Sequence, residues 1–159
     1  MIGIDLTTPS DTEIRMTRTF YAPRDLVWRL WTDAERIPEI WGWRDAETTV
    51  HAWDLRPGGA WRISGKGQDG VVYVFFGEFL DVEPNELLVW TFGYEGMTDE
   101  PLVESLRFEE HDGRTTIVST STFETREARD AMLGTGMAEG AAETYDRFEE
   151  LLARELAQA

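Results

Sequence analysis

Apolar residues recur at steps of three and four along the last part of the chain. This spacing matches the helical repeat of about 3.6 residues and leaves the opposite face to charged side chains. It predicts one long helix over Glu127–Ala159, which must bury its apolar stripe against another layer. The predicted core-facing positions are Leu133, Met137, Ala141, Tyr145, Phe148, Leu151, Leu152 and Leu156.

Most of the chain before this helix alternates apolar and polar residues, a pattern typical of strands. Short connectors such as Pro84-Asn85 and Asp112-Gly113 require antiparallel pairing. Gly77 interrupts the longest strand pattern and predicts a bend or bulge in a curved sheet. Pro23 is expected to begin one short helix and Ala34 a second. The fold class is therefore α+β, with strands predicted over residues 11–21, 48–55, 60–64, 71–82, 87–94, 102–110 and 114–123.

Length and charge narrow the classes of function. The 159 residues are predicted to form one domain. The sequence has no cysteine, no signal-peptide pattern and no apolar run of about 18 residues. These features predict a cytoplasmic protein without membrane insertion. A net charge of −16 argues against nucleic acid, because phosphate binding needs a basic face. A protein partner remains open, and the chain is compatible with a monomer or a homodimer.

The Asp112-Gly113 hairpin fixes which residues share a face. If His111 pairs with Arg114, then Glu104, Ser119 and Ser121 point towards the apolar core. A buried carboxylate needs partners or a raised pKa, and such groups gather at functional sites. The alternative is that Glu104 lies near the end of the sheet and reaches water.

A second hairpin gathers large rings on one face around Gly77. A glycine among large rings is expected to leave space, and space beside a curved sheet is how a ligand pocket arises. The alternative is an ordinary aromatic core. The rings are Tyr73, Phe75, Phe79, Trp90, Phe92 and Tyr94.

Motifs for catalysis and for metal binding are mostly absent from the sequence. His51 and His111 are the only histidines, and neither has metal-ligand spacing. No nucleophile elbow or phosphate loop is present. We therefore assign no catalytic residue, no metal site and no cofactor.

Several segments in order along the chain resemble the START-like (SRPBCC) superfamily. More narrowly, they resemble the family named for activators of the heat-shock protein 90 ATPase. The similarity spans about Thr12–Leu152. The segments that carry it are Phe20–Pro23, Val27–Asp33, Trp41–Trp43, Asp54–Arg62, Gly77–Phe79, Pro84–Leu87, Thr91-Phe92 and Gly134–Phe148.

The resemblance implies a helix-grip fold, in which a curved antiparallel sheet wraps a long C-terminal helix and two short helices follow the first strand. It also implies a hydrophobic cavity between sheet and helix. Function transfers poorly within a superfamily that includes carriers, aromatase/cyclases and co-chaperones. The eukaryotic co-chaperones have an additional N-terminal domain for which this chain has no room, so we expect the family name to be weak evidence of chaperone activity.

Three hypotheses follow. The first, which we favour, is binding of a small apolar or aromatic molecule in the cavity. The second is a cyclase or dehydratase with Glu104 or His51 as acid/base and Tyr145 as hydrogen-bond donor. The third is a stress-related co-chaperone or protein-interaction module. The predicted ligand-binding residues are Trp31, Trp41, Trp43, Trp61, Phe75, Trp90, Glu104, Phe108, Met137 and Tyr145.

Overall fold

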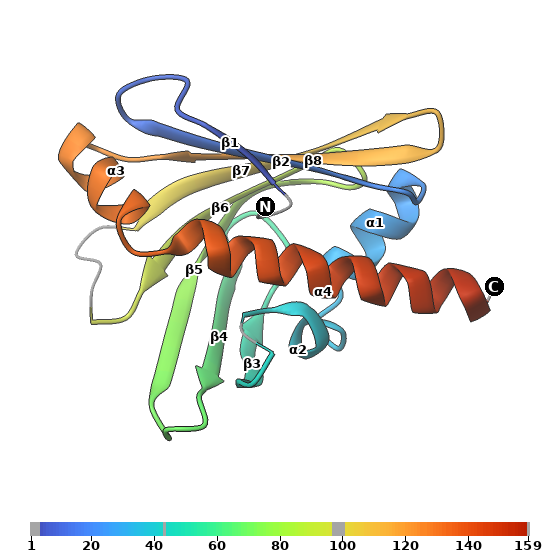
Figure 1. Ribbon diagram of the computed structural model, residues 1–159, viewed down its shortest axis with the longest axis horizontal. Coiled ribbons are helices and arrows are strands. Elements are labelled where there is room, and N and C mark those ends of the chain that lie inside the picture. Colours follow the sequence, from blue (N-terminus) through green and yellow to red (C-terminus); the bar gives the residue numbers. More distant parts are fainter. Residues whose placement is uncertain (1–3, 43, 97–100, 159) are drawn as a thin grey trace.

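A curved, eight-stranded antiparallel sheet holds a long C-terminal helix across its concave face (Figure 1). The computed structural model describes residues 4–42, 44–96 and 101–158. The strand order is β1-β2-β8-β7-β6-β5-β4-β3. The strands are β1 (Asp5–Thr7), β2 (Glu13–Phe20), β3 (Glu47–Trp53), β4 (Ala60–Lys66), β5 (Val72–Glu83), β6 (Leu87–Tyr94), β7 (Leu102–His111) and β8 (Arg114–Thr122). The helices are α1 (Arg24–Trp31), α2 (Ile37–Ile40), α3 (Arg126–Leu133) and α4 (Met137–Gln158).

This architecture confirms the predicted α+β helix-grip fold. Each pair of neighbouring strands is antiparallel, as the short connectors require. None of the four helices within the described residues is both long and apolar enough to cross a membrane.

The prediction of one continuous C-terminal helix is wrong, because the chain turns between α3 and α4. Gly134 ends α3, and Gly136 has a φ of 79°, a conformation that a right-handed helix does not contain. Leu133 is only partly buried and Leu156 is 44% exposed, so neither belongs to the buried stripe. The buried residues of α4 are Ala142, Tyr145, Phe148, Leu151 and Leu152.

Four smaller differences concern element boundaries and strand register. The strand β1 was not predicted, because its three residues are too few for an alternating pattern to show. Pro23 is the N-cap of α1 rather than its first residue. The second short helix begins at Ile37, three residues later than expected, since the residues before it form a turn. The register shift in β5 falls between Phe79 and Asp81 and not at Gly77.

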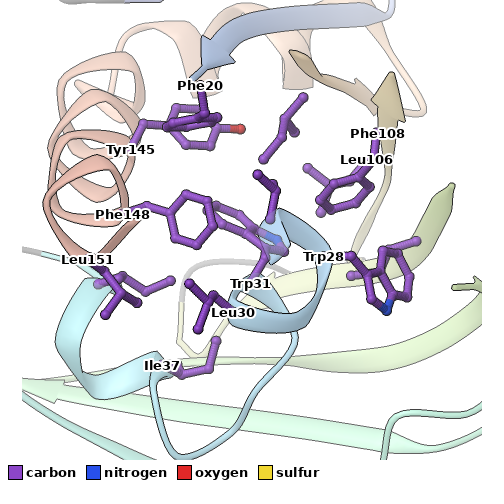
Figure 2. Packing of buried hydrophobic residues seen from close by; sticks show 14 of the residues in the cluster. Phe20, Trp28, Leu30, Trp31, Ile37, Leu106, Phe108, Tyr145, Phe148 and Leu151 are labelled. Atoms are coloured by element: carbon purple, nitrogen blue, oxygen red, sulfur yellow. The ribbon is translucent and has the colours of Figure 1, made fainter. Parts of the chain in front are cut away.

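Aromatic rings from three elements meet where α4 crosses the sheet. Phe148 is fully buried, and its ring lies edge-on to Phe20 of β2 at 5.2 Å and to Trp31 of α1 at 5.0 Å. Figure 2 shows Tyr145, Phe148 and Leu151 projecting from α4 into this cluster. Burial of each large ring stabilises the fold by about 1.5–3 kcal/mol, so this contact fixes the helix on the sheet.

Candidate functional site

A polar cluster lies inside the apolar face of the sheet, centred on Glu104 of β7. The predicted pairing of His111 with Arg114 is confirmed, and it places Glu104 opposite Ser121. On the other side Glu104 pairs with Trp90 of β6. Its carboxylate accepts hydrogen bonds from Trp90 Nε1 at 2.7 Å, from Ser119 Oγ at 2.7 Å and from Ser121 Oγ at 3.4 Å.

Burial governs the electrostatics of this carboxylate. Removal from water raises the pKa of Glu104, because the charged form loses its hydration. The hydrogen bonds from Ser119, Trp90 and Ser121 act in the opposite direction but are the smaller effects. Glu104 thus points to the inner face of the sheet, as predicted, although its side chain is only partly buried there.

Tyr145 of α4 faces the same interior. The residue is 4% exposed, and its ring stacks on Trp31 at 5.5 Å. Burial raises the pKa of Tyr145, and the nearby charge of Glu104 raises it further. Among the described residues no hydrogen bond contributes to the pKa of the Tyr145 hydroxyl, and Figure 2 shows the hydroxyl pointing away from α4. A carboxyl group and a hydroxyl thus lie within electrostatic reach of each other.

Trp61 of β4 and Trp90 form the wall beside this cluster. Their rings stack at 4.4 Å, and Trp61 Nε1 donates a hydrogen bond to the Thr91 carbonyl at 3.0 Å. The backbone N–H of Glu78 donates a hydrogen bond to the Thr91 hydroxyl. The ladder between β5 and β6 is interrupted at Gly77 and Glu78, where the Trp61 indole lies. A Cβ on Gly77 would lie 1.9 Å from the Thr91 carbonyl oxygen. The expectation that Gly77 leaves free space is wrong, since Trp61 and Thr91 fill it.

Half-buried rings continue this wall towards the surface. We call Trp41, Phe75, Phe92 and Tyr94 the aromatic shelf, because each is only partly buried. The ring of Trp41, just after α2, lies about 6 Å from those of Trp61, Phe75, Trp90 and Phe92. The shared face predicted for the β5–β6 rings is confirmed.

Polar contacts from α4 hold the Trp41 segment in place. Arg147 donates hydrogen bonds to the carbonyl oxygens of Trp41, Gly42 and Pro38, at 3.0, 3.1 and 3.2 Å. The Thr144 hydroxyl accepts a hydrogen bond from the Gly42 N–H at 3.1 Å. Burial lowers the pKa of Arg147. The sequence pattern assigned Arg147 to the charged outer face of the helix, and no local signal distinguishes it from the other arginines.

The predicted ligand-binding residues divide into two groups. Trp31, Trp41, Trp61, Phe75, Trp90, Glu104 and Tyr145 form a connected set through the contacts above. Phe108 instead pairs with Trp28 of α1 at 5.1 Å, outside that set. Met137 is partly buried at the first turn of α4, and Trp43 lies outside the described residues.

Neither histidine joins the site. His51 is exposed at the β-bulge of β3 and bonds Ser64 Oγ at 2.7 Å. His111 is exposed in the β7–β8 turn. Within the described ranges no group of three His, Asp or Glu side chains could hold a metal ion.

Two depressions lie elsewhere on the surface. One, of about 460 Å³, covers the outer face of β2, β8 and β7, and the other, of about 370 Å³, lies near the start of α1. Of the predicted ligand-binding residues they include Phe108 alone. The aromatic rings beside α4 contact one another, and neither of these two depressions lies at the cavity predicted between sheet and helix.

Solved structures with the same fold come from several bacteria. Protein Ms6760 from Mycobacterium smegmatis is 28% identical, with a TM-score of 0.85 over 94% of this chain and 96% of that one. A protein from Rhodobacter sphaeroides is 24% identical, with a TM-score of 0.86 over 95% and 98%. DynU16, a protein of the dynemicin biosynthetic locus, is 20% identical, with a TM-score of 0.71 over 91% of this chain and 48% of that one.

No curated protein matches the chain. The family model described as activator of Hsp90 ATPase homolog 1-like protein matches residues 21–153, which include the whole of the site described above. The match covers well over half of the sequence and agrees with the START-like resemblance of its motifs. The chain therefore belongs to the family of activator of Hsp90 ATPase homolog 1-like proteins.

Proposed function

We propose that the chain binds a small hydrophobic or aromatic molecule between the inner face of the sheet and α4. The observation that carries this proposal is the polar cluster around Glu104, enclosed by apolar and aromatic side chains. Such sites combine a mostly apolar lining with a few polar groups that orient the ligand. Glu104 and the Tyr145 hydroxyl are polar groups of this kind, and the aromatic shelf supplies the apolar surface next to them.

A buried acid that served stability alone would be costly. Desolvation of a carboxylate exceeds what neutral hydrogen-bond donors return, as the raised pKa of Glu104 indicates. The shelf rings remain half-buried although they are large and apolar. Both features support an interior that exchanges part of its packing for a bound molecule.

Native mass spectrometry of the gently purified protein tests this function, with the denatured chain as reference. We expect an additional mass that is lost on denaturation, and the same spectrum reports the oligomeric state. The Trp41→Ala variant should retain less of it, because Trp41 contacts four rings of the wall and shelf. Tyr21→Ala removes a ring that is 73% exposed and should retain as much as the wild type.

If native mass spectrometry shows no retained ligand, the protein is titrated with small aromatic fragments. The indole N–H resonances of Trp61 and Trp90 are followed by NMR during the titration. Movement of these signals by a fragment supports binding at the wall. The proposal is refuted if the purified chain is bare and no fragment of any charge shifts either signal.

A cyclase or dehydratase activity is the second candidate. It is favoured by the electrostatic effect of Glu104 on the pKa of Tyr145, which pairs an acid with a hydrogen-bond donor on the same inner face. His51 has no part in it, because it lies on an exposed bulge. Conversion of a bound molecule by the wild type, and its loss in Glu104→Gln with binding retained, would favour an enzyme over a carrier.

A co-chaperone role is the third candidate, and the family's name points to it. The observation in its favour is the run Val71–Tyr73 at the start of β5, whose three side chains are all exposed. Stimulation of an Hsp90 ATPase by the wild type, but not by Val72→Lys, would support this role. An unchanged ATPase rate excludes it.

A further inference from the structure

Glu104 has hydrogen-bond donors but no cationic partner. All fifteen arginine and lysine residues and both histidines fall within the described part of the chain. None of them donates a hydrogen bond to Glu104 or forms an ion pair with it there. Its three donors, an indole N–H and two hydroxyl groups, are neutral.

The charged groups of the neighbouring elements are committed elsewhere. Arg18 of β2 is close enough to act on the pKa of Tyr145, but it bonds Asp146 Oδ1 at 2.6 Å and Glu149 Oε2 at 3.0 Å. On β6 and β8 the groups that bond the carboxylate are Trp90, Ser119 and Ser121, and none of the causes that shift its pKa is a charged group. Glu104 in turn raises the pKa of Tyr145 of α4. The negative charge of Glu104 therefore has no counter-charge within the fold.

The surroundings favour a positive charge in two further ways. A carboxylate has about four acceptor positions, of which the three donors occupy three, so one remains for a ligand. The net charge of −16 also raises the local concentration of cations around the protein.

We propose that the ligand of this site is an organic cation: a protonated amine on a small apolar or aromatic body, whose ammonium group donates to Glu104. This proposal rests on the proposed binding function and specifies its ligand class. An anionic ligand would meet the charge of Glu104 without a compensating base. A neutral ligand is compatible with the protonated form of Glu104, whereas an ammonium group supplies the partner that the ionised form lacks.

Binding should then depend on pH through Glu104. Burial raises the pKa of Glu104 in the free protein, which favours its neutral form. A bound cation favours the ionised form, so affinity for the amine rises as pH rises through the pKa of Glu104. A neutral ligand should show no such rise.

Three probes with one ring and one chain length separate charge from shape: phenethylamine, phenethyl alcohol and phenylacetate. Each is titrated near neutral pH into the full chain while the Trp90 indole N–H signal is recorded by NMR. We expect phenethylamine to bind about tenfold or more tightly than the alcohol, since a charge-assisted hydrogen bond is stronger than a neutral one. Phenylacetate should bind weakest.

Two variants with the same loss of charge locate the effect. Glu104→Gln should abolish the preference for the amine, whereas Glu109→Gln, an exposed position on the same strand, should keep it. Should Glu104→Gln fail to fold, the wild-type preference is measured at decreasing pH, where protonation of Glu104 should remove it. Loss of the preference on acidification then supports the proposal, and a constant preference overturns it.

Failure of this inference differs from failure of the proposed function. Equal binding of amine and alcohol, or a preference that survives Glu104→Gln, overturns the cation assignment and leaves binding intact. No response of Trp90 to any of the three probes also overturns it, while the mass retained in the native spectrum separately decides whether the protein binds a ligand.

Discussion

Substitution of Gly77 by alanine tests the local structure that forms the wall of the site. The new Cβ would lie 1.9 Å from the Thr91 carbonyl oxygen and 2.6 Å from Trp61 Nε1. Carbon and oxygen atoms in sheets approach to about 3.3 Å, so β5 and β6 must separate by more than about 1 Å. That movement breaks the 3.0 Å hydrogen bond from Trp61 to Thr91.

The cost follows from these two effects. Overpacking costs about 1–3 kcal/mol, and a carbonyl left without its donor costs about 1–3 kcal/mol. We expect Gly77→Ala to lower the free energy of unfolding by about 2–4 kcal/mol. The movement of the indole should also weaken the stacking of Trp61 on Trp90, and with it ligand binding.

Urea denaturation followed by tryptophan fluorescence measures the loss. Gly65→Ala is the matched control, because Gly65 is also a buried strand glycine, and a Cβ there would meet only the Ala46 Cβ at an ordinary 3.8 Å. Its stability should change by less than about 1 kcal/mol. The explanation is refuted if Gly77→Ala is no more destabilising than Gly65→Ala.

Three further substitutions test the core and the polar cluster by the same denaturation assay. Phe148→Ala should cost about 3–5 kcal/mol, since it empties a fully buried ring position, and a loss below about 1 kcal/mol would contradict the packing of α4. Tyr145→Phe should change stability by less than about 1 kcal/mol, because no hydrogen bond from a described residue contributes to the pKa of the hydroxyl, and a larger loss would reveal a partner. Glu104→Gln should remove a pH dependence of the free energy of unfolding. The unfolded chain releases the Glu104 proton at a lower pH than the folded protein does, because folding raises the pKa of Glu104. Wild-type stability therefore falls as the pH rises from the pKa of the unfolded state through that of the folded state. Parallel stability curves for wild type and variant would contradict the raised pKa.

The interior position of Glu104 was predictable because a two-residue turn fixes strand register. Asp112-Gly113 provides the positive φ values of 52° and 77° that such a turn needs, and alternation then carries the faces from His111 back to Glu104. The same reasoning predicted that Ser119 and Ser121 lie on the inner face of the sheet. Periodicity also identified the stripe of α4, because a buried helix face needs apolar residues every three or four positions.

Other parts of the site depend on contacts that no local pattern encodes. The atoms that fill the space beside Gly77 belong to Trp61 and Thr91, which are distant from it in sequence. The sequence therefore indicated a gap at the place where Trp61 lies. Arg147 resembles every other arginine on a charged helix face, yet it bonds carbonyl groups more than a hundred residues away in sequence. The glycine at position 136 is compatible both with a kinked continuous helix and with a turn that ends one helix before the next begins. The sequence alone therefore does not distinguish these two structures.

The polar cluster is not needed to define the sheet. The register of β7 and β8 is already fixed by the Asp112-Gly113 turn and by the buried side chains of Leu106 and Ile117 on the inner face. An apolar side chain in place of Glu104 would keep that register and avoid the cost of desolvating a carboxylate. Strand register therefore does not by itself account for the carboxylate, since apolar replacements of buried charged groups often leave a fold as stable as before. What the carboxylate adds is a titratable group among aromatic side chains, and this is the feature that the proposed ligand would use.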